Sequence, residues 1–411
     1  IWSRLVGSEM CIRDRFGILI KAKKAGFFVI TTKQKSPAYE KKLYAKILKK
    51  LRSTYSEPLK GHSLRRVKKL AGFICGMILK KRSTMSALGS GLPQYITAHS
   101  KEKACKQFLD NAWNDYQTHY LPYITHYLPL FIEQASSGDS VYFVIDGSQV
   151  GNAHVALMVS LVYKNRSLPI NWLVKKGGKG HFTTQMHLDL LQQVYGQVKT
   201  LLPKDKSVTL LGDGEFDSIG IQLFCRKNGW NYVLRTASNT VMYEGNERFQ
   251  PKNLEISAQQ NYLFVPEVDF TEQRLKKVNF LYWHELKYDQ PISLVSNLSE
   301  PIDIMNAYDK RYAIECLFKD LKTTSFNLHK TRLTDAFAIS NLIMVAAFAF
   351  TLLIKLATKY EKSEIRKRLH RIRPDRIVCS VFFFALELIS FLLEEDLQFN
   401  FDFYKHSMNF P

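Results

Sequence analysis

The stretch of sequence that decides the fold is VYFVIDGS, residues 141–148. Its first five residues are all β-branched or aromatic and run directly into Asp146 and Gly147, which is typical of a short strand that ends in a turn. Two further strands are predicted at residues 155–163 and 168–174. The chain then continues with the pattern helix, strand, helix, strand, at residues 188–202, 208–211, 219–228 and 232–235.

Three consecutive strands followed by helix, strand, helix and strand indicate an α/β fold with a mixed sheet of ribonuclease H type. Scattered strand-like runs at residues 239–305 indicate a β-rich insertion, and from residue 307 the pattern is helical again. The ribonuclease H-like core is therefore predicted in two parts, 136–238 and 306–360, separated by the insertion and followed by a C-terminal helical region at 361–411.

A basic, all-helical head is predicted at residues 16–135, ahead of the sheet. Residues 39–55 and 64–81 have the periodicity of amphipathic basic helices, and Ser100 is the predicted N-cap of a helix over 101–116. Residues 1–15 do not begin with Met and resemble translated sequencing-adapter text, so we expect them to be a non-native leader.

The charge of the chain is concentrated at its N-terminal end. Against 58 Lys and Arg stand 37 Asp and Glu, giving a net charge of +21, and residues 1–82 alone contain 22 cations and 4 anions. Such a block binds polyanions by releasing their counterions, so nucleic acid is the first predicted partner and an anionic membrane surface the second. The six cysteines are widely spaced without a CxxC pair, which argues against a cysteine zinc site and favours a reducing, cytoplasmic location.

An apolar segment near the C-terminal end raises the question of a membrane anchor. Residues 336–354 carry no charge over 19 positions, which is long enough for one transmembrane helix. Ser340, Asn341 and Thr351 interrupt the segment, and a buried core helix has the same composition. We therefore expect a core helix and no membrane partner.

Two aspartates fall at predicted strand ends. Asp146 follows the first strand and Asp213 the fourth, and these strands are expected to be neighbours in a ribonuclease H-type sheet. Two carboxylates side by side repel each other unless a cation lies between them, and Mg²⁺ prefers such oxygen ligands. An aspartate at a strand end is also a common turn former, so neither residue alone is decisive.

A third carboxylate lies on a predicted helix. If residues 308–322 form one α-helix, a turn of 100° per residue brings six side chains within an arc of about 100°: Tyr308, Arg311, Tyr312, Glu315, Lys319 and Lys322. Apolar residues fill the opposite face, so Glu315 is expected on the exposed face among cations. Ion pairs on an ordinary solvated helix would give the same pattern.

Tyr308, Arg311, Glu315 and Lys322 have the spacing Y-(2)-R-(3)-E-(6)-K, which resembles the signature of the DDE transposases of bacterial insertion sequences, family four. The segments around Asp146 and Asp213 (VTLLGDGEFDS, residues 208–218) resemble the first two acidic blocks of that family, in the same order. Gly214 is a departure, because bulkier residues often follow the second aspartate there.

This resemblance implies a ribonuclease H-like fold and a metal-dependent, cut-and-paste DNA transposase. It implies that Asp146, Asp213 and Glu315 are catalytic and hold two Mg²⁺ ions, for which Mn²⁺ substitutes. The partners it implies are double-stranded DNA, as transposon ends and as target, and a second copy of the chain in a synaptic homodimer. A relative that binds DNA and no longer cuts it is the alternative.

DNA-binding residues are predicted in three places. On the glutamate helix they are Tyr308, Arg311, Lys319 and Lys322. In the insertion, Trp283 is a candidate for stacking on an extruded base, although a core tryptophan would give the same sequence. In the head, the cations predicted to grip the terminal inverted repeats include Arg65, Arg66, Lys68, Lys69 and Arg82.

Overall fold

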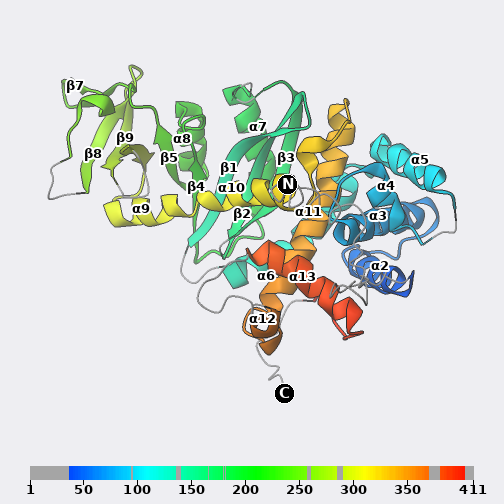
Figure 1. Cartoon of the computed structure of the whole chain (residues 1–411). Helices are drawn as coiled ribbons and strands as arrows, with labels where there is room; N and C mark the ends of the chain where they lie inside the picture. Colours follow the sequence, from blue (N-terminus) through cyan, green and yellow to red (C-terminus); the bar gives the residue numbers. More distant parts are fainter. Residues whose placement is uncertain are drawn as a thin grey trace, which may run out of the picture.

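The fold was analysed in a computed structural model, which describes residues 37–93, 96–135, 140–164, 166–178, 180, 182–256, 261–284, 290–369 and 380–402. Residues 1–15, predicted to be a non-native leader, lie outside these ranges. A large sheet and its helices form one half of the molecule, and a group of helices forms the other (Figure 1).

The sheet has ten strands in the order β3-β2-β1-β4-β5-β10-β9-β8-β6-β7. The strands of its first half are β1 (Ser140–Val150), β2 (His154–Tyr163), β3 (Arg166–Lys176), β4 (Ser207–Gly212) and β5 (Asn231–Thr236). β1 pairs antiparallel with β2 and parallel with β4, so the sheet is mixed, as predicted. The helices α7 (Thr184–Val198) and α8 (Ile219–Lys227) connect β3 to β4 and β4 to β5.

The predicted β-rich insertion continues this same sheet. It consists of β6 (Met242–Glu244), β7 (Glu247–Phe249), β8 (Tyr262–Phe270), β9 (Leu275–Trp283) and β10 (Ile292–Ser296). The last of these strands pairs antiparallel with β5, with Ser293 opposite Thr236, and β9 pairs with β10 in turn. The insertion is thus joined to the core by backbone hydrogen bonds along a whole strand.

Helices cover both faces of the first half of the sheet. Every residue of β2 is buried, which requires protein on both sides. Neighbouring residues of β3 show which helix lies where: Trp172 donates from Nε1 to Ser340 of α11 (Ala336–Lys359), whereas Asn171 donates to Gln193 of α7. Because adjacent side chains of a strand point to opposite faces, α11 and α7 lie on opposite sides of the sheet.

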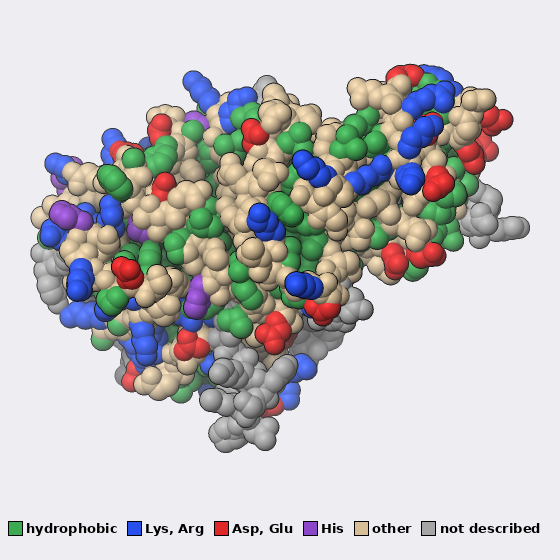
Figure 2. Space-filling view, turned by 180° about the vertical axis from the view of Figure 1, so that it is seen from behind, with side chains coloured by type: hydrophobic (Ala, Val, Ile, Leu, Met, Phe, Trp, Pro, Cys, Tyr) green, Lys and Arg blue, Asp and Glu red, His purple; other side chains and the backbone are tan. Residues whose placement is uncertain are grey.

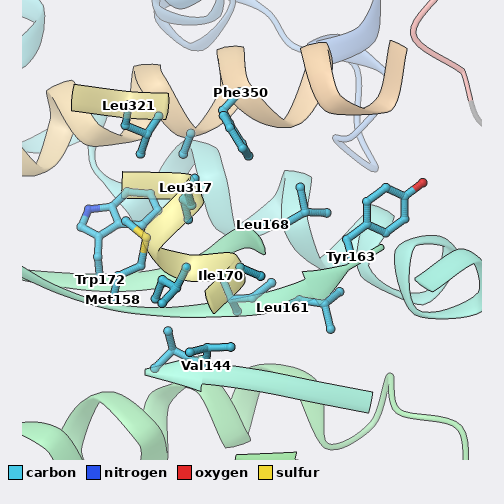
Figure 3. Close-up of a cluster of buried hydrophobic side chains, with 14 of the residues drawn as sticks. Val144, Met158, Leu161, Tyr163, Leu168, Ile170, Trp172, Leu317, Leu321 and Phe350 are labelled. Atoms are coloured by element: carbon cyan, nitrogen blue, oxygen red, sulfur yellow. The ribbon is translucent and has the colours of Figure 1, made fainter. Parts of the chain in front are cut away.

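The α11 helix is the apolar centre of the molecule. It packs against β3 on one side and against head helices and α13 (Val381–Glu394) on the other. Figure 3 shows Phe350 of α11 beside Leu317 and Leu321, above Leu168 and Ile170 of β3. Within the described residues α11 is the helix long and apolar enough to cross a membrane, but 89% of its apolar window is buried inside the protein. Its burial fits the predicted core helix.

The head consists of α2 (Pro37–Arg52), α3 (Gly61–Lys80), α4 (Met85–Ser90), α5 (Ala98–Leu109) and α6 (Tyr116–Ala135). It is packed onto the rest of the chain, since α3, α5 and α6 all contact α11. Lys, Arg and His side chains gather on the left of Figure 2, which is the right-hand, head side of Figure 1.

The helix predicted at residues 101–116 is wrong at both ends. The helix starts at Ala98, because the Thr97 hydroxyl, and not Ser100, accepts a hydrogen bond from a free N–H of the first turn. It ends at Leu109, because the Asn111 side chain accepts from the backbone N–H of Trp113 and so starts a separate short turn. That turn, η2 (Ala112–Asn114), connects α5 to α6.

Candidate active site

Two aspartates follow the point where the parallel pairing of β1 and β4 ends. Asp213 lies just past the end of β4, but Asp146 lies inside β1, which continues to Val150 because residues 147–150 still pair with β2; the predicted end of the strand at Asp146 is therefore wrong. In the β1–β4 register Val144 lies opposite Leu211, and each aspartate follows two residues later, so Asp146 and Asp213 stand at the same level of the sheet. Side chains two residues apart share a face, and Asp146 lies opposite Met158, on the α11 side. The first and fourth strands are thus neighbours, as predicted.

Short local hydrogen bonds fix each aspartate. Asp146 is 6% exposed, and its Oδ1 accepts from the Gly147 N–H at 2.7 Å. Asp213 lies just past the end of β4, where its Oδ1 accepts from the Glu215 N–H at 3.0 Å. A Cβ added at Gly214 would meet nothing nearer than the Arg235 carbonyl at 4.0 Å, so a larger residue fits there and the glycine does not change the turn.

The third carboxylate, Glu315, is presented by a helix that is shorter than predicted. The helix α9 (Pro301–Asp309) ends before Arg311, and α10 (Tyr312–Lys319) starts after it. Three-residue hydrogen bonds, such as Arg311 N to Tyr308 O at 2.9 Å, tighten the chain at this junction. A π-helical turn, η4 (Asp320–Thr324), then contains Lys322.

The predicted helix face is correct for α10 and wrong for Tyr308. Ala313, Ile314, Leu317, Phe318 and Leu321 are buried, as predicted for the apolar face. Tyr308 was expected on the exposed face but is only 4% exposed. The reason is the break at residues 310–311, which changes the direction of the chain between Tyr308 and Glu315.

The Arg311 guanidinium connects Asp146 to Glu315. Its Nη1 lies 3.8 Å from Asp146 Oδ2, and its Nη2 donates to Glu315 Oε1. Burial alone would lower the pKa of Arg311, but Tyr308, Glu315, Asp146 and Asp213 together raise it above its ordinary value. One permanent cation thus lies against Asp146 and Glu315.

A buried ion pair ties α10 to the sheet. Asp320, directly after α10, lies with its Oδ2 3.3 Å from Nε of Arg166 at the start of β3, and both side chains are largely buried. Burial raises the pKa of Asp320 to about 6, although Arg166 and a hydrogen bond from Thr324 act in the opposite direction. Together with buried Leu317, this pair holds the helix that carries Glu315 against β1–β3.

A family model described as the transposase DDE domain matches residues 133–352, more than half of the chain. The chain belongs to this transposase family. The match includes all three carboxylates, the insertion and most of α11. A comparison with curated proteins finds no match.

Solved structures resemble this DDE domain protein only distantly. Human endonuclease V is 12% identical, with a TM-score of 0.26 over 50% of this chain and 98% of that one. The Argonaute of Marinitoga piezophila, in complex with guide RNA and target DNA, is 14% identical, with a TM-score of 0.22 over 55% of this chain and 34% of that one. Likeness at this level says nothing about the site.

The remaining predicted site residues of the DDE domain are spread out. Lys319 is exposed on α10, while Lys322 is half-buried and its carbonyl oxygen lies 2.8 Å from His329 Nδ1. Trp283 is 4% exposed within the insertion, so neither face of its indole is open to a base, and we set that prediction aside. The head cations lie on α3 and just after it: Arg65, Lys68 and Arg82 are exposed, and Arg66 and Lys69 are half-buried.

Sequence reasoning missed one neighbour of Asp213. His187 of α7 was expected to be structural, but its Nε2 lies 3.7 Å from Glu215 Oε1, and its ring lies tilted against Phe216 with the ring centres 4.8 Å apart. Burial lowers the pKa of His187, and the nearby Asp213 carboxylate acts in the opposite direction. No spacing in the sequence links His187 to Asp213, because the contact depends on how α7 packs against the turn after β4.

A hollow of about 460 Å³ opens beside Asp213. Its wall is formed by the turn after β4, the end of β5 with the exposed Arg235, and the start of β10 with the residues just before it, including the buried Ser293. The insertion thus shapes one side of the space next to the carboxylates.

The donor set fits a divalent metal in its chemistry. Asp146, Asp213 and Glu315 supply only carboxylate oxygens, which are the ligands that Mg²⁺ and Mn²⁺ prefer. Among the described residues, however, no three His, Cys, Asp or Glu side chains lie close enough together to hold an ion as they stand. Arg311 lies between Asp146 and Glu315 instead, so metal binding requires this guanidinium to release them.

Proposed function

We propose that this protein is a cut-and-paste DNA transposase of an insertion sequence, of the family-four group with the Y-R-E-K signature. The observation that supports the proposal is that Asp146 and Glu315, from distant parts of the chain, both lie against the Arg311 guanidinium, while Asp213 follows the strand next to that of Asp146. Membership of the transposase DDE domain family supports the same class of nucleic-acid-cleaving chemistry.

In this proposal Asp146, Asp213 and Glu315 would hold two Mg²⁺ ions. Bound divalent ions would polarise the scissile phosphate, activate the attacking water and stabilise the leaving 3′ oxygen. Arg311 is the residue that changes partner: it neutralises Asp146 and Glu315 in the free protein and passes to a DNA phosphate when the ions and substrate arrive. Lys319 and Lys322, on the same side, bind neighbouring phosphates.

Cleavage at the transposon end frees a 3′ hydroxyl, and the same site then joins this hydroxyl to target DNA. The hollow beside Asp213 gives the DNA strand room next to the carboxylates. The head binds the terminal inverted repeats through the cations of α3, and a second copy of the chain completes the synaptic complex. The buried Tyr308 helps to position Arg311, since the guanidinium lies 5.7 Å from the centre of its ring.

Nicking of a supercoiled plasmid that carries both ends of the element tests the proposal. In Mg²⁺ or Mn²⁺ the wild-type protein is expected to nick the plasmid, and Asp146→Asn, Asp213→Asn and Glu315→Gln are expected to lose this activity while they still bind DNA. Asp205→Asn is the control, because this aspartate is exposed in the turn at the opposite end of β4.

Nicking by any of the three variants at the wild-type rate would refute the assignment of the site. A wild-type protein that binds the plasmid ends but never nicks them, in either metal, would favour the alternative of a DNA-binding relative without cleavage activity.

A further inference from the structure

One tryptophan of the head is exposed to solvent. Trp113 is 69% exposed, whereas the other tryptophans of the described part of the chain, Trp172, Trp230 and Trp283, are at most 6% exposed. An indole is the largest apolar side chain, and its exposure leaves a surface that a partner can cover. Trp113 is also the most exposed of the large hydrophobic residues among those described.

The backbone holds Trp113 in a fixed place. It is the middle residue of the short turn η2, where the Asn111 side chain accepts from the Trp113 N–H at 2.9 Å. The next residue, Asn114, is 2% exposed, and its side chain donates to Phe108 O at 3.0 Å. Anchors on both sides mean that the exposed indole does not depend on a flexible loop, so little entropy is lost when a partner covers it.

The surroundings of Trp113 are strongly basic. The Arg66 guanidinium of α3 lies 5.8 Å from the centre of its ring, as a cation–π pair. Arg65 and Lys68 are exposed on the same helix. Residues 37–109 as a whole contain 17 Lys and Arg against 3 Asp and Glu, a net charge of +14. An acidic or neutral protein surface would match the indole, but only a polyanion matches this density of positive charge.

We propose that Trp113 is a DNA-contacting residue of the head, which places its indole against the sugars and base edges of a duplex while Arg65 and Lys68 bind the flanking phosphates. This inference rests on the proposed function, since it names where the head touches its substrate. Apolar side chains that enter the minor groove contact these surfaces directly, and the adjoining cations set the position on the backbone. Arg66, stacked on the indole and donating to Ser63 Oγ at 3.4 Å, orients the ring.

Tryptophan fluorescence can test this contact in the full chain without substituting Trp113. In a Trp2→Phe background Trp113 is the tryptophan that acrylamide reaches, because the other three are buried. Saturation with a mixed-sequence DNA duplex of about 30 base pairs is expected to lower the acrylamide quenching constant severalfold. Long-chain polyphosphate, which has charge but neither sugar nor base, is expected to bind and to leave Trp113 accessible.

Substitutions separate the apolar contact from the ionic ones. Trp113→Ala is expected to weaken duplex binding by roughly tenfold, the size of one lost aromatic contact, with an unchanged salt dependence. Arg65→Gln is expected to lower the slope of log K against log salt by about 1. Leu223→Ala, another exposed apolar residue at 48% exposure but on α8, is the matched control and should change neither quantity.

If the duplex binds, by fluorescence anisotropy of a labelled strand, while Trp113 stays equally quenchable and Trp113→Ala binds normally, this inference is overturned and the proposed function survives. If no duplex binds to the wild-type protein at low salt, both are overturned. Equal protection of Trp113 by polyphosphate would also overturn the inference, because it would show that charge alone covers the ring.

Discussion

The buried pair Arg166–Asp320 leads to a prediction that runs against the usual expectation for an ion pair. The difference in the free energy of unfolding between Asp320→Asn and wild type should shift in favour of the variant as the pH rises. The reason is that burial outweighs the attraction of Arg166 and raises the pKa of Asp320 from 3.8 to about 6. Both side chains are nearly buried, at 12% and 5% exposure, so solvent screens the pair weakly.

The sign follows from proton linkage. A carboxyl group whose pKa is raised on folding contributes stability that is fully present below the unfolded pKa of 3.8 and is lost as the pH rises through the folded pKa of about 6. A shift of roughly two units corresponds to about 3 kcal/mol in total, of which about 2 kcal/mol falls between roughly pH 4.5 and 7.5. Asparagine does not titrate, so across this pH interval the free energy of unfolding of the variant should rise by about this amount relative to that of wild type.

Urea unfolding of both proteins at the two pH values measures the effect, with intrinsic fluorescence as the probe and the slope m as a check that the same surface is exposed. Asp303→Asn, an exposed aspartate on α9, controls for a general effect of removing charge and should show no such gain. The reasoning is refuted if Asp320→Asn loses stability relative to wild type as the pH rises, because that would mean that Arg166 stabilises the charged carboxylate more than burial penalises it.

Three further predictions concern the site and the core. Arg311→Gln should bind Mn²⁺ about tenfold more tightly than wild type, a typical coupling between charges, because no guanidinium then competes for Asp146 and Glu315. The rise in melting temperature on titration with Mn²⁺ measures this affinity, and the same rise in both proteins would contradict the prediction. Leu317→Ala should lower the free energy of unfolding in urea by about 2–5 kcal/mol, since this side chain is fully buried between the sheet and α11, and a loss well below that would show that the site collapses around the cavity. Burial lowers the pKa of Lys355 to about 5, while the unfolded chain still binds the proton, so the free energy of unfolding of wild type should fall by up to about 1.4 kcal/mol per pH unit from about pH 10 towards 5. Lys355→Met should remove this fall. Equal pH profiles for the two proteins in urea unfolding would exclude it.

The first half of the sheet was predictable because its strands are continuous apolar runs. The predicted segment at residues 141–145, for instance, lies in β1, which is buried without a break from Phe143 to Ser148. The extension of the sheet was not predictable, since the pairing of β10 with β5 joins segments about 60 residues apart and leaves no local pattern. The short strands β6 and β7, at three residues each, are below the length at which periodicity can be recognised.

The sequence predicted three carboxylates for the site, and the position of Asp146 beside the strand of Asp213 follows from strand order. It could not show that Arg311 would lie between Asp146 and Glu315. Helical spacing alone predicts an Arg311–Glu315 pair on one helix, but the break between α9 and α10 also brings the guanidinium to Asp146 on β1. The same break buries Tyr308. A single tightened turn therefore decides both the error in the predicted helix face and the electrostatics of the site.

The distribution of charge in the head also has to be read from the folded chain. The sequence presents one basic block, yet one stripe of α2 is already neutralised by the chain itself. Lys42 pairs with Asp396 at 2.5 Å, and Lys50 with Asp402 at 2.7 Å, while Lys46 donates to a backbone carbonyl between them.

These three lysines are spaced four residues apart, so they form one face of α2 that the segment at residues 394–402 covers. That segment is held by buried aromatic side chains, Phe399 at 5% exposure and Phe401 at 2%, and not by charge alone. DNA would have to displace an apolar contact to reach this face, whereas the cations of α3 beside Trp113 are already open to solvent. Substitutions of the open cations on α3, and not of those on the covered face of α2, should therefore control DNA binding.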